Sequence, residues 1–553
     1  MQRRRMLRLV LASCAAMATA AANAAPGYDL VIRGARVLDG TGSPWYYADV
    51  AVIGQRIVAV GKLPATVDAK RTIDASSQYL APGFIDAHSH AWPGIVEAQL
   101  SNAEPLLTQG ITTVVANPDG GGPIDLQKQR ADIEKARPGV NVALLVPHNS
   151  IRVAVLSHDD RAPNANELAR MQALVREGME AGALGLSAGP FYSPGNFSKT
   201  DEHIALARVA AQFDGIYTSH IRDESQYNIG LLAAVDEVIQ VAREARLPGI
   251  VTHIKALTPA CWGMSADVIR NINAARATGV EVFADHYPYE ASSTSLSAAI
   301  IPSWAMEGGE KALQKRLATP EQRAKVRIDA AENLAKRGGA QSFLITSYRA
   351  DPSLEGARLD AIARQRKADA VDVALDLIAN GSPTIVSFAM SEPDLRAFMA
   401  QPWTMTSTDG SLISPKQGIP HPRAYGTFPR KLRRYVLDDA VISLEQAVHS
   451  MTGLTASIMR LRDRGAIRVG ARADLVVFDA ATIRDNATYS QPRQLSSGVN
   501  FVVVNGVVAV SAGRITEARA GQVVSRSTSN LSDSVLDQPR KASGELSTER
   551  SQP

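Results

Sequence analysis

Two histidines separated by one residue make the sharpest chemical motif in the chain. They end the segment PGFIDAHSH (82–90), a short apolar run with the pattern of a β-strand. Residues i and i+2 of a strand point to the same side, so the imidazoles of His88 and His90 can face one point at the strand end. Neutral imidazoles are common ligands of zinc and similar divalent ions. The pair alone is a weak signal and needs further ligands that converge on it.

Three more candidate ligands end later strand-like runs. His220 ends GIYTSH, His253 ends GIVTH, and Asp409 lies in WTMTSTDG. A single histidine at a strand end is usually a packed structural residue, but four histidines with an aspartate are harder to explain that way. If these runs belong to one barrel, the five side chains meet at its mouth, because barrel active sites lie at the C-terminal ends of the strands. A structural zinc is disfavoured, because its Cys or His ligands normally lie close together in sequence.

The elements that must position these residues alternate between strand-like and helical runs along 83–462. The strand-like runs are FIDAHSH, ITTVVAN, NVALLVPH, GALGLSAG, GIYTSHIR, GIVTHIK, VEVFADHYPY and WTMTSTDG. A capping box, Asn164-x-x-Glu167, opens one of the helices between them. Eight alternating strands and helices predict a (β/α)₈ barrel rather than an open sheet. The stretch from about 290 to 384 is too long for one crossover, and it predicts a small insertion over the barrel mouth.

Both ends of the chain outside this barrel are rich in short β-branched runs. VIRGARVLDG and ADVAVIGQRIVAVG lie within 25–82, and ARADLVVFD and VNFVVVNGVVAVSAGRIT lie within 463–525. Because both ends have this pattern of short β-branched runs, we predict that they fold together into one small β-sandwich beside the barrel. The segment 526–553 is rich in serine and has no apolar periodicity, so we expect it to be disordered.

Composition excludes several classes of protein. The chain has 553 residues, of which 45% are hydrophobic and 21% charged, as in soluble globular proteins. Its two cysteines exclude a disulfide scaffold and a cysteine-rich zinc module. Four of its 59 basic residues lie at positions 3–8, in a segment that we expect to be removed, which leaves 55 basic against 55 acidic residues. This balance argues against a nucleic-acid or anionic-membrane partner.

The first 24 residues have the pattern of an export signal. A basic start is followed by a short apolar, alanine-rich run and by Ala22-Asn23-Ala24, which fits a small-x-small cleavage site. RRRMLR also resembles a twin-arginine signal, whose pathway carries folded proteins. We therefore expect a mature protein that starts at Ala25 in a bacterial periplasm, without an integral membrane segment. LASC, ending at Cys14, resembles a lipoprotein cleavage box, and lipidation is the less favoured alternative.

Taken together, these motifs resemble the amidohydrolase superfamily and, within it, the D-aminoacylase (N-acyl-D-amino-acid deacylase) family. The resemblance spans Tyr28 to Val524, and its landmarks are VIRGARVLDGTG, APGFIDAHSH, GLSAGPFYSPG, SHIRDE, THIKA, DHYPYEASSTSL, STDG, HPRAYGTFPRKL and ARADLVVFD. It implies a distorted (β/α)₈ TIM-like barrel, a small β-sandwich domain formed from both chain ends, and one or two zinc ions. It also implies that His88 and His90 form one half of the metal site and His220 and His253 the other. Asp409 would be both a metal ligand and the catalytic carboxylate.

One departure from the family pattern affects the metal site. The family places a cysteine ligand after the second barrel strand, where this chain reads ANPDG (116–120). Asp119 is the nearest carboxylate, and it could replace the thiolate as a harder ligand. The alternative is that Asp119 only forms the Asp-Gly turn. Cys261 lies eight residues beyond His253 and is not expected to be the missing ligand.

The resemblance implies hydrolysis of the linear amide of an N-acyl-D-amino acid, giving a D-amino acid and a carboxylate. Asp409 would act as general base and then general acid. The substrate would be a small molecule held by its free carboxylate. Lys255, on the same side of its strand as His253, could supply the positive charge, and Tyr192, Tyr287 and Ser293 match pocket positions of the family.

Other functions stay open at this point. A cyclic-amide hydrolase of the hydantoinase or dihydroorotase type, or a dipeptidase, would use the same fold, although those relatives typically carry a lysine ligand that is absent here. A non-catalytic binding protein on the same barrel would have no reason to keep the histidines and Asp409. The sequence indicates neither the substrate side chain, nor the acyl group, nor the oligomeric state.

Overall fold

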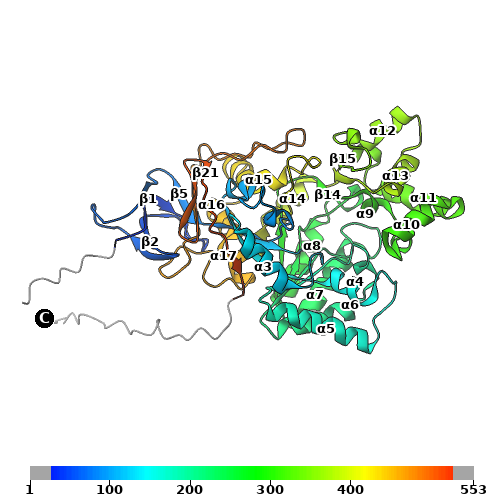
Figure 1. The fold of residues 1–553 in the computed structure, drawn as a ribbon, viewed down its shortest axis with the longest axis horizontal. Helices are drawn as coiled ribbons and strands as arrows, with labels where there is room; N and C mark the ends of the chain where they lie inside the picture. The colour runs from blue at the N-terminus through cyan, green and yellow to red at the C-terminus, as the bar shows by residue number, and fades with distance from the viewer. Residues whose placement is uncertain (1–26, 527–553) are drawn as a thin grey trace, which may run out of the picture.

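The computed structural model describes residues 27–526 of the chain (Figure 1). The predicted signal segment (1–24) and all but the first residue of the predicted tail (526–553) lie outside the described residues. Those two interpretations therefore stay predictions. Within residues 27–526, no helix is both long and apolar enough to cross a membrane.

Eight parallel strands form the barrel that holds the candidate site, as predicted. They are β6 (Phe84–Asp86), β7 (Ile111–Ala116), β8 (Asn141–Leu144) continued by β9 (Val146–Pro147), β10 (Gly185–Ala188), β11 (Ile216–Ser219), β12 (Gly249–Val251), β13 (Val282–His286) and β17 (Thr404–Thr406). The last strand closes on the first, since the Ala87 amide donates to the Thr406 carbonyl (3.3 Å). The strands are buried on both faces, which explains why their sequences are nearly continuous apolar runs.

Helices cover the outside of the barrel between its strands. They are α2 (Glu104–Leu107), α3 (Leu126–Ala136), α4 (His148–Leu156), α5 (Ala165–Glu180), α6 (Thr200–Ala211), α7 (Leu231–Ala245), α8 (Ser265–Ala277), α14 (Glu392–Met399), α15 (Arg423–Arg430), α16 (Leu444–Met451) and α17 (Gly453–Ile458). The predicted capping box opens α5: the Asn164 side chain accepts from the Glu167 amide, and the Glu167 side chain accepts from the Asn164 amide. This exchange satisfies two amides that a helix start otherwise leaves free.

The two chain ends build one nine-stranded sheet beside the barrel (Figure 1). Its strands are β1 (Leu30–Val37), β2 (Tyr46–Ile53), β3 (Arg56–Gly61), β4 (Thr72–Asp74), β5 (Tyr79–Pro82), β18 (Leu475–Phe478), β19 (Val499–Val504), β20 (Val507–Ser511) and β21 (Arg514–Ile515). The halves join where β5 pairs antiparallel with β18. Side chains from both halves share one core, for example Ile32, Leu80 and Val477. The predicted fold class, a barrel with a small sheet domain made from both ends, is confirmed.

The last described strand, β22 (Val523–Val524), departs from the predicted arrangement. It pairs in parallel with barrel strand β8, so it does not join the nine-stranded sheet. The segment expected to complete the sheet domain, 463–525, thus returns to the barrel at its end. Arg526 holds this return, because its guanidinium donates to the carbonyls of Met179 and Ala183 (2.6 and 2.8 Å).

An inserted unit lies between β13 and β17, in the region where an insertion was expected. It contains a three-stranded antiparallel sheet in the order β14 (Ser292–Ser295), β16 (Thr384–Ser387), β15 (Phe343–Ser347). Five helices pack on this sheet around a separate apolar core: α9 (Leu296–Ile300), α10 (Gly309–Ala318), α11 (Pro320–Lys336), α12 (Leu359–Arg366) and α13 (Ala370–Ala379). Figure 1 shows the unit as a lobe at one end of the molecule, opposite the nine-stranded sheet.

Candidate metal centre

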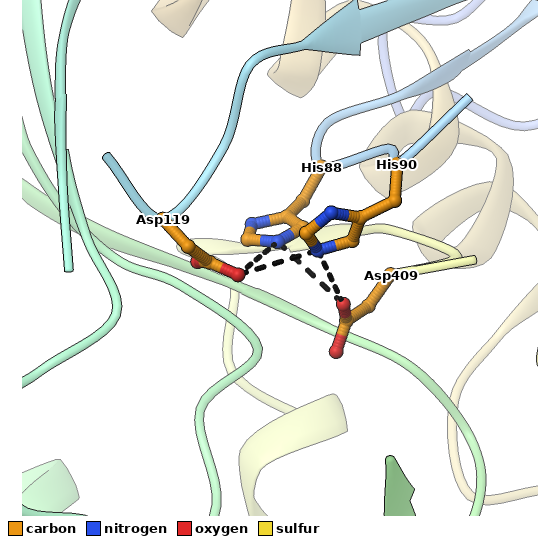
Figure 2. Close-up of side chains that lie close together, drawn as sticks. All are labelled: His88, His90, Asp119 and Asp409. Atoms are coloured by element: carbon orange, nitrogen blue, oxygen red, sulfur yellow. Dashed lines mark ion pairs between the residues drawn. The ribbon is translucent and has the colours of Figure 1, made fainter. Parts of the chain in front are cut away.

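The barrel brings all six predicted ligands together at the C-terminal ends of its strands. His88 and His90 follow β6, Asp119 follows β7, His220 follows β11, His253 follows β12 and Asp409 follows β17. Their ligand atoms form two groups, His88–His90–Asp119–Asp409 and Asp119–His220–His253. Figure 2 shows the first group, with its imidazoles and carboxylates pointing toward one common centre.

Asp119 belongs to both groups because its two oxygens face different histidines. Oδ2 lies 3.5 Å from His88 Nε2 and 3.3 Å from His90 Nε2. Oδ1 lies 3.6 Å from His253 Nε2 and 3.8 Å from His220 Nδ1. The carboxylate could therefore offer one oxygen to each ligand group, and it lies where the family resemblance places a cysteine ligand.

Hydrogen bonds from the Asn117 side chain hold the loop that carries Asp119. The Asn117 side chain donates to Gln129 (2.8 Å) and to the Leu145 carbonyl (3.2 Å). Asn117 and Asp119 both have positive φ angles, 62° and 56°. Asn and Asp tolerate this left-handed conformation better than most residues, so the sequence can turn the Asp119 carboxylate toward the histidines.

Asp409 is fixed by neighbours on both sides. The preceding residue, Thr408, donates through its amide and its hydroxyl to the buried Asp86 carboxylate (2.8 and 2.5 Å). Asp409 Oδ1 lies 3.2 Å from His90 Nε2 and 3.6 Å from His88 Nε2, while Oδ2 lies 2.7 Å from Arg423 Nη1. Burial would raise the pKa of Asp409, but Arg423 lowers it well below its usual value. The carboxylate is therefore ionised at neutral pH.

The geometry of the six residues fits divalent metal ions. Two ligands about 2.1 Å from one tetrahedral ion lie about 3.4 Å apart, and the nitrogen–oxygen separations in the cluster span 3.2 to 3.8 Å. Several atoms of the cluster are buried without a hydrogen-bond partner among the described residues, namely His88 Nε2, Asp119 Oδ1 and His220 Nδ1, which faces Asp119. Buried polar atoms are nearly always partnered, and an ion would provide the missing partners.

The cluster opens into a cavity of about 430 Å³ that the barrel and the inserted unit line together. All four predicted substrate-binding residues line it: Lys255, Tyr192, Tyr287 and Ser293. The Tyr192 ring packs on the His220 ring, with centroids 4.6 Å apart. The Arg423 guanidinium lies over the Tyr287 ring, 4.6 Å from its centroid. The four residues thus share one space with the metal cluster.

Lys255 makes closer contacts with the metal cluster than its position two residues after His253 predicted. Its ammonium pairs with the buried Glu224 carboxylate and lies 2.7 Å from His253 Nδ1. Glu224 in turn lies 3.2 Å from His253 Nδ1 and 3.8 Å from His220 Nε2. Burial would raise the pKa of Glu224, but Lys255 lowers it far below its usual value. Glu224 thus contacts one candidate ligand, His253, and lies near a second, His220, and sequence reasoning missed it.

Sequence reasoning also missed Asp285 and Arg337. Asp285 accepts from the His253 amide (2.9 Å) and from the Ser407 hydroxyl (2.6 Å), so it ties two strand ends together. Arg337 lines the cavity from the inserted unit. Cys261, which was not expected to be a ligand, is buried and belongs to neither ligand group among the described residues.

Comparison with known proteins identifies relatives over nearly the whole chain. The model of the amidohydrolase family matches residues 71–510. The chain is 36% identical to N-acyl-D-glutamate deacylase of Alcaligenes xylosoxydans xylosoxydans, across 91% of this chain and 97% of the relative. It is 34% identical to D-aminoacylase of the same organism, across 90% and 98%.

A solved structure shows the same likeness in three dimensions. The N-acyl-D-glutamate deacylase of Bordetella bronchiseptica, complexed with zinc and a phosphonate mimic of the tetrahedral intermediate, superposes with a TM-score of 0.77 at 34% identity. The match covers 91% of this chain and 100% of that one. The protein therefore belongs to the amidohydrolase family and is a hydrolase of carbon–nitrogen bonds other than peptide bonds.

Proposed function

We propose that the protein is a zinc-dependent deacylase that hydrolyses the linear amide of N-acyl-D-amino acids and releases a D-amino acid and a carboxylate. The observation that carries this proposal is the pair of ligand groups that share Asp119 at the barrel mouth. The deacylase activities named for the relatives, and the zinc in one of them, support the reaction class and the metal.

His88, His90, Asp119 and Asp409 would hold one ion, and Asp119, His220 and His253 the other. A bound zinc ion supplies a Lewis acid that polarises the amide carbonyl and increases the acidity of a water ligand. Neutral imidazoles are needed for this role. The acidic neighbours raise the pKa of His90 to about 9 against the opposing effect of burial, so metal loading is expected to release its proton.

Asp409 is the group placed to move the proton. Its Oδ1 faces the His88–His90 side of the cluster, while Oδ2 forms an ion pair with Arg423. As an ionised carboxylate it can take a proton from the attacking water and return it to the leaving nitrogen. Arg423 is held in turn, because its backbone amide donates to His421 Nδ1 (3.0 Å).

Lys255 is suited to bind the substrate's α-carboxylate. An ammonium has three N–H groups, and Glu224 and His253 take up at most two of them. The third can reach into the cavity, where the hydroxyls of Tyr287 and Ser293 lie on the same lining. A carboxylate there would be held next to the carbon that bears the scissile amide.

The decisive experiment is an assay of purified, zinc-loaded protein on matched N-acetyl-D- and N-acetyl-L-amino acids. Release of the free D-amino acid, with little turnover of the L-forms, would support the proposal. Turnover of dihydrouracil or hydantoin instead would favour the cyclic-amide alternative. Protein that binds no metal and turns over neither class would indicate a binding role.

We also propose that the protein is exported through the twin-arginine pathway and acts in a periplasm. The support is the pattern of the first 24 residues alone. N-terminal sequencing of the exported protein should give Ala25. Replacing Arg3 and Arg4 by lysine should block export, and undiminished export would favour the general secretion route.

A further inference from the structure

Arg337 is a buried arginine that faces the active-site cavity from the inserted unit. It follows the last residue of α11, is 2% exposed and lines the same cavity as the metal cluster. Its Nε donates to the Tyr227 hydroxyl (2.6 Å). Its Nη1 is buried and has no hydrogen-bond partner within residues 27–526, and no carboxylate of those residues forms an ion pair with it.

The other two long cations of the cavity carry their own counter-charges. Lys255 is paired with Glu224, and Arg423 with Asp409. Burying a charge without a partner is costly, so buried guanidinium groups are normally paired. Arg337 is therefore the cation on this lining whose partner would have to come from a ligand. A guanidinium presents a planar fork that matches a carboxylate.

The wall that carries Arg337 indicates which carboxylate this would be. The metal ligands come from the barrel strand ends, whereas Ser295, Thr384 and Arg337 reach the cavity from the inserted unit. The scissile amide has to sit at the metal cluster, with the α-carboxylate near Lys255. A substrate side chain directed toward the inserted unit would then meet Arg337.

We propose that Arg337 binds a carboxylate on the substrate's side chain, so that the preferred substrates are N-acyl-D-amino acids with an acidic side chain. This inference rests on the proposed deacylase function. Overall similarity does not decide the point, because the relatives named N-acyl-D-glutamate deacylase and D-aminoacylase are almost equally similar to this chain. Arg337 would act as a specificity-determining residue.

The test compares N-acetyl-D-glutamate with N-acetyl-D-glutamine, which has nearly the same shape and a neutral side chain. Zinc-loaded wild-type enzyme should prefer the glutamate by at least about tenfold in kcat/KM, as expected for one hydrogen bond to a charged group. Arg337→Gln should lower kcat/KM for the glutamate by about 10- to 100-fold. Its kcat/KM for the glutamine should stay within about threefold of wild type, with metal content unchanged.

Lys336→Gln is the matched control, because Lys336 is the adjacent cation, pairs with Glu332 and does not line the cavity. It should leave both substrates unaffected. Equal losses on both substrates in Arg337→Gln would overturn the proposal and make Arg337 a positioning residue for Tyr227.

If Arg337→Gln fails to fold, the wild-type preference still decides, since equal turnover of the two substrates refutes the inference. Wild-type hydrolysis of neutral substrates with no preference for acidic ones would refute only this inference. A wild type that hydrolyses neither of these two substrates nor any other N-acetyl-D-amino acid would refute the deacylase function and this inference with it.

Discussion

Replacing Asp119 by asparagine tests whether one carboxylate holds two ions. Oδ2 faces His88 and His90, and Oδ1 faces His220 and His253, at separations of 3.3 to 3.8 Å. Asparagine keeps the shape of the side chain but has one oxygen, because its amide nitrogen cannot act as a ligand in this form. Only one of the two groups can therefore retain its contact.

In Asp119→Asn, the ligand group formed with His220 and His253 should lose more metal affinity than the other group. The first group still has Asp409 as an anionic ligand, whereas the second would keep two imidazoles only. Loss of an outer-shell partner of a metal ligand typically weakens metal binding 10- to 100-fold, so loss of a direct, charged ligand should weaken it by at least about 100-fold, or about 2.7 kcal/mol.

The assay is zinc content by mass spectrometry after equilibration at a series of buffered free-zinc concentrations. Wild-type protein should approach two ions per chain and Asp119→Asn about one. Asp119→Cys should regain the second ion, since a thiolate can also bind zinc. Asp125→Asn is the control: Asp125 is exposed in the same segment and only caps α3. Unchanged stoichiometry and affinity in Asp119→Asn would return Asp119 to a turn residue and refute the bridging geometry.

Three further changes test other parts of the site. Asp409→Asn should keep most of the zinc but lower kcat by at least about 10²-fold in steady-state assays, and near-wild-type turnover would place the general base elsewhere. Glu224→Gln should leave Lys255 as an unpaired buried charge and lower the unfolding free energy by about 3–5 kcal/mol in urea titrations; a change below about 1 kcal/mol would contradict that role. Lys431→Met should stabilise the fold, because burial lowers the pKa of Lys431 to about 7. The unfolded chain holds that proton up to about pH 10.4, so the gain in Tm should be largest at or below pH 7 and shrink toward pH 10; a gain that grows with pH would contradict the assignment.

The strand-end ligands could be predicted because each one is tied to a local pattern. An apolar run that ends in His or Asp marks both the strand and the edge where its side chain emerges, and parallel barrel strands all end at the same mouth. His220 and His253 were found in this way although 33 residues separate them. The same reasoning identified all eight barrel strands, because strands buried on both faces leave continuous apolar runs.

Glu224 and Arg337 could not be found by this route. Glu224 lies in a loop, and its pairing with Lys255 depends on how that loop folds back over the next strand. Arg337 comes from the inserted unit, so its place in the cavity depends on how that unit packs on the barrel. The pairing of β22 with β8 is of the same kind. Each is a long-range packing result with no local periodicity to reveal it.

The charges that line the cavity can be matched one by one, and the two that remain unmatched define what the site lacks. Glu224 is balanced by Lys255, and Asp409 by Arg423. Among the described residues, the Asp119 carboxylate forms ion pairs only with imidazoles, and imidazoles that act as metal ligands are neutral. Its negative charge therefore requires bound metal cations, and the surrounding histidines are placed to bind them. Arg337 requires an anion, which a substrate with an acidic side chain would bring. Zinc ions and an acidic substrate bring opposite charges into the same cavity, so zinc loading and binding of an acidic substrate should reinforce each other.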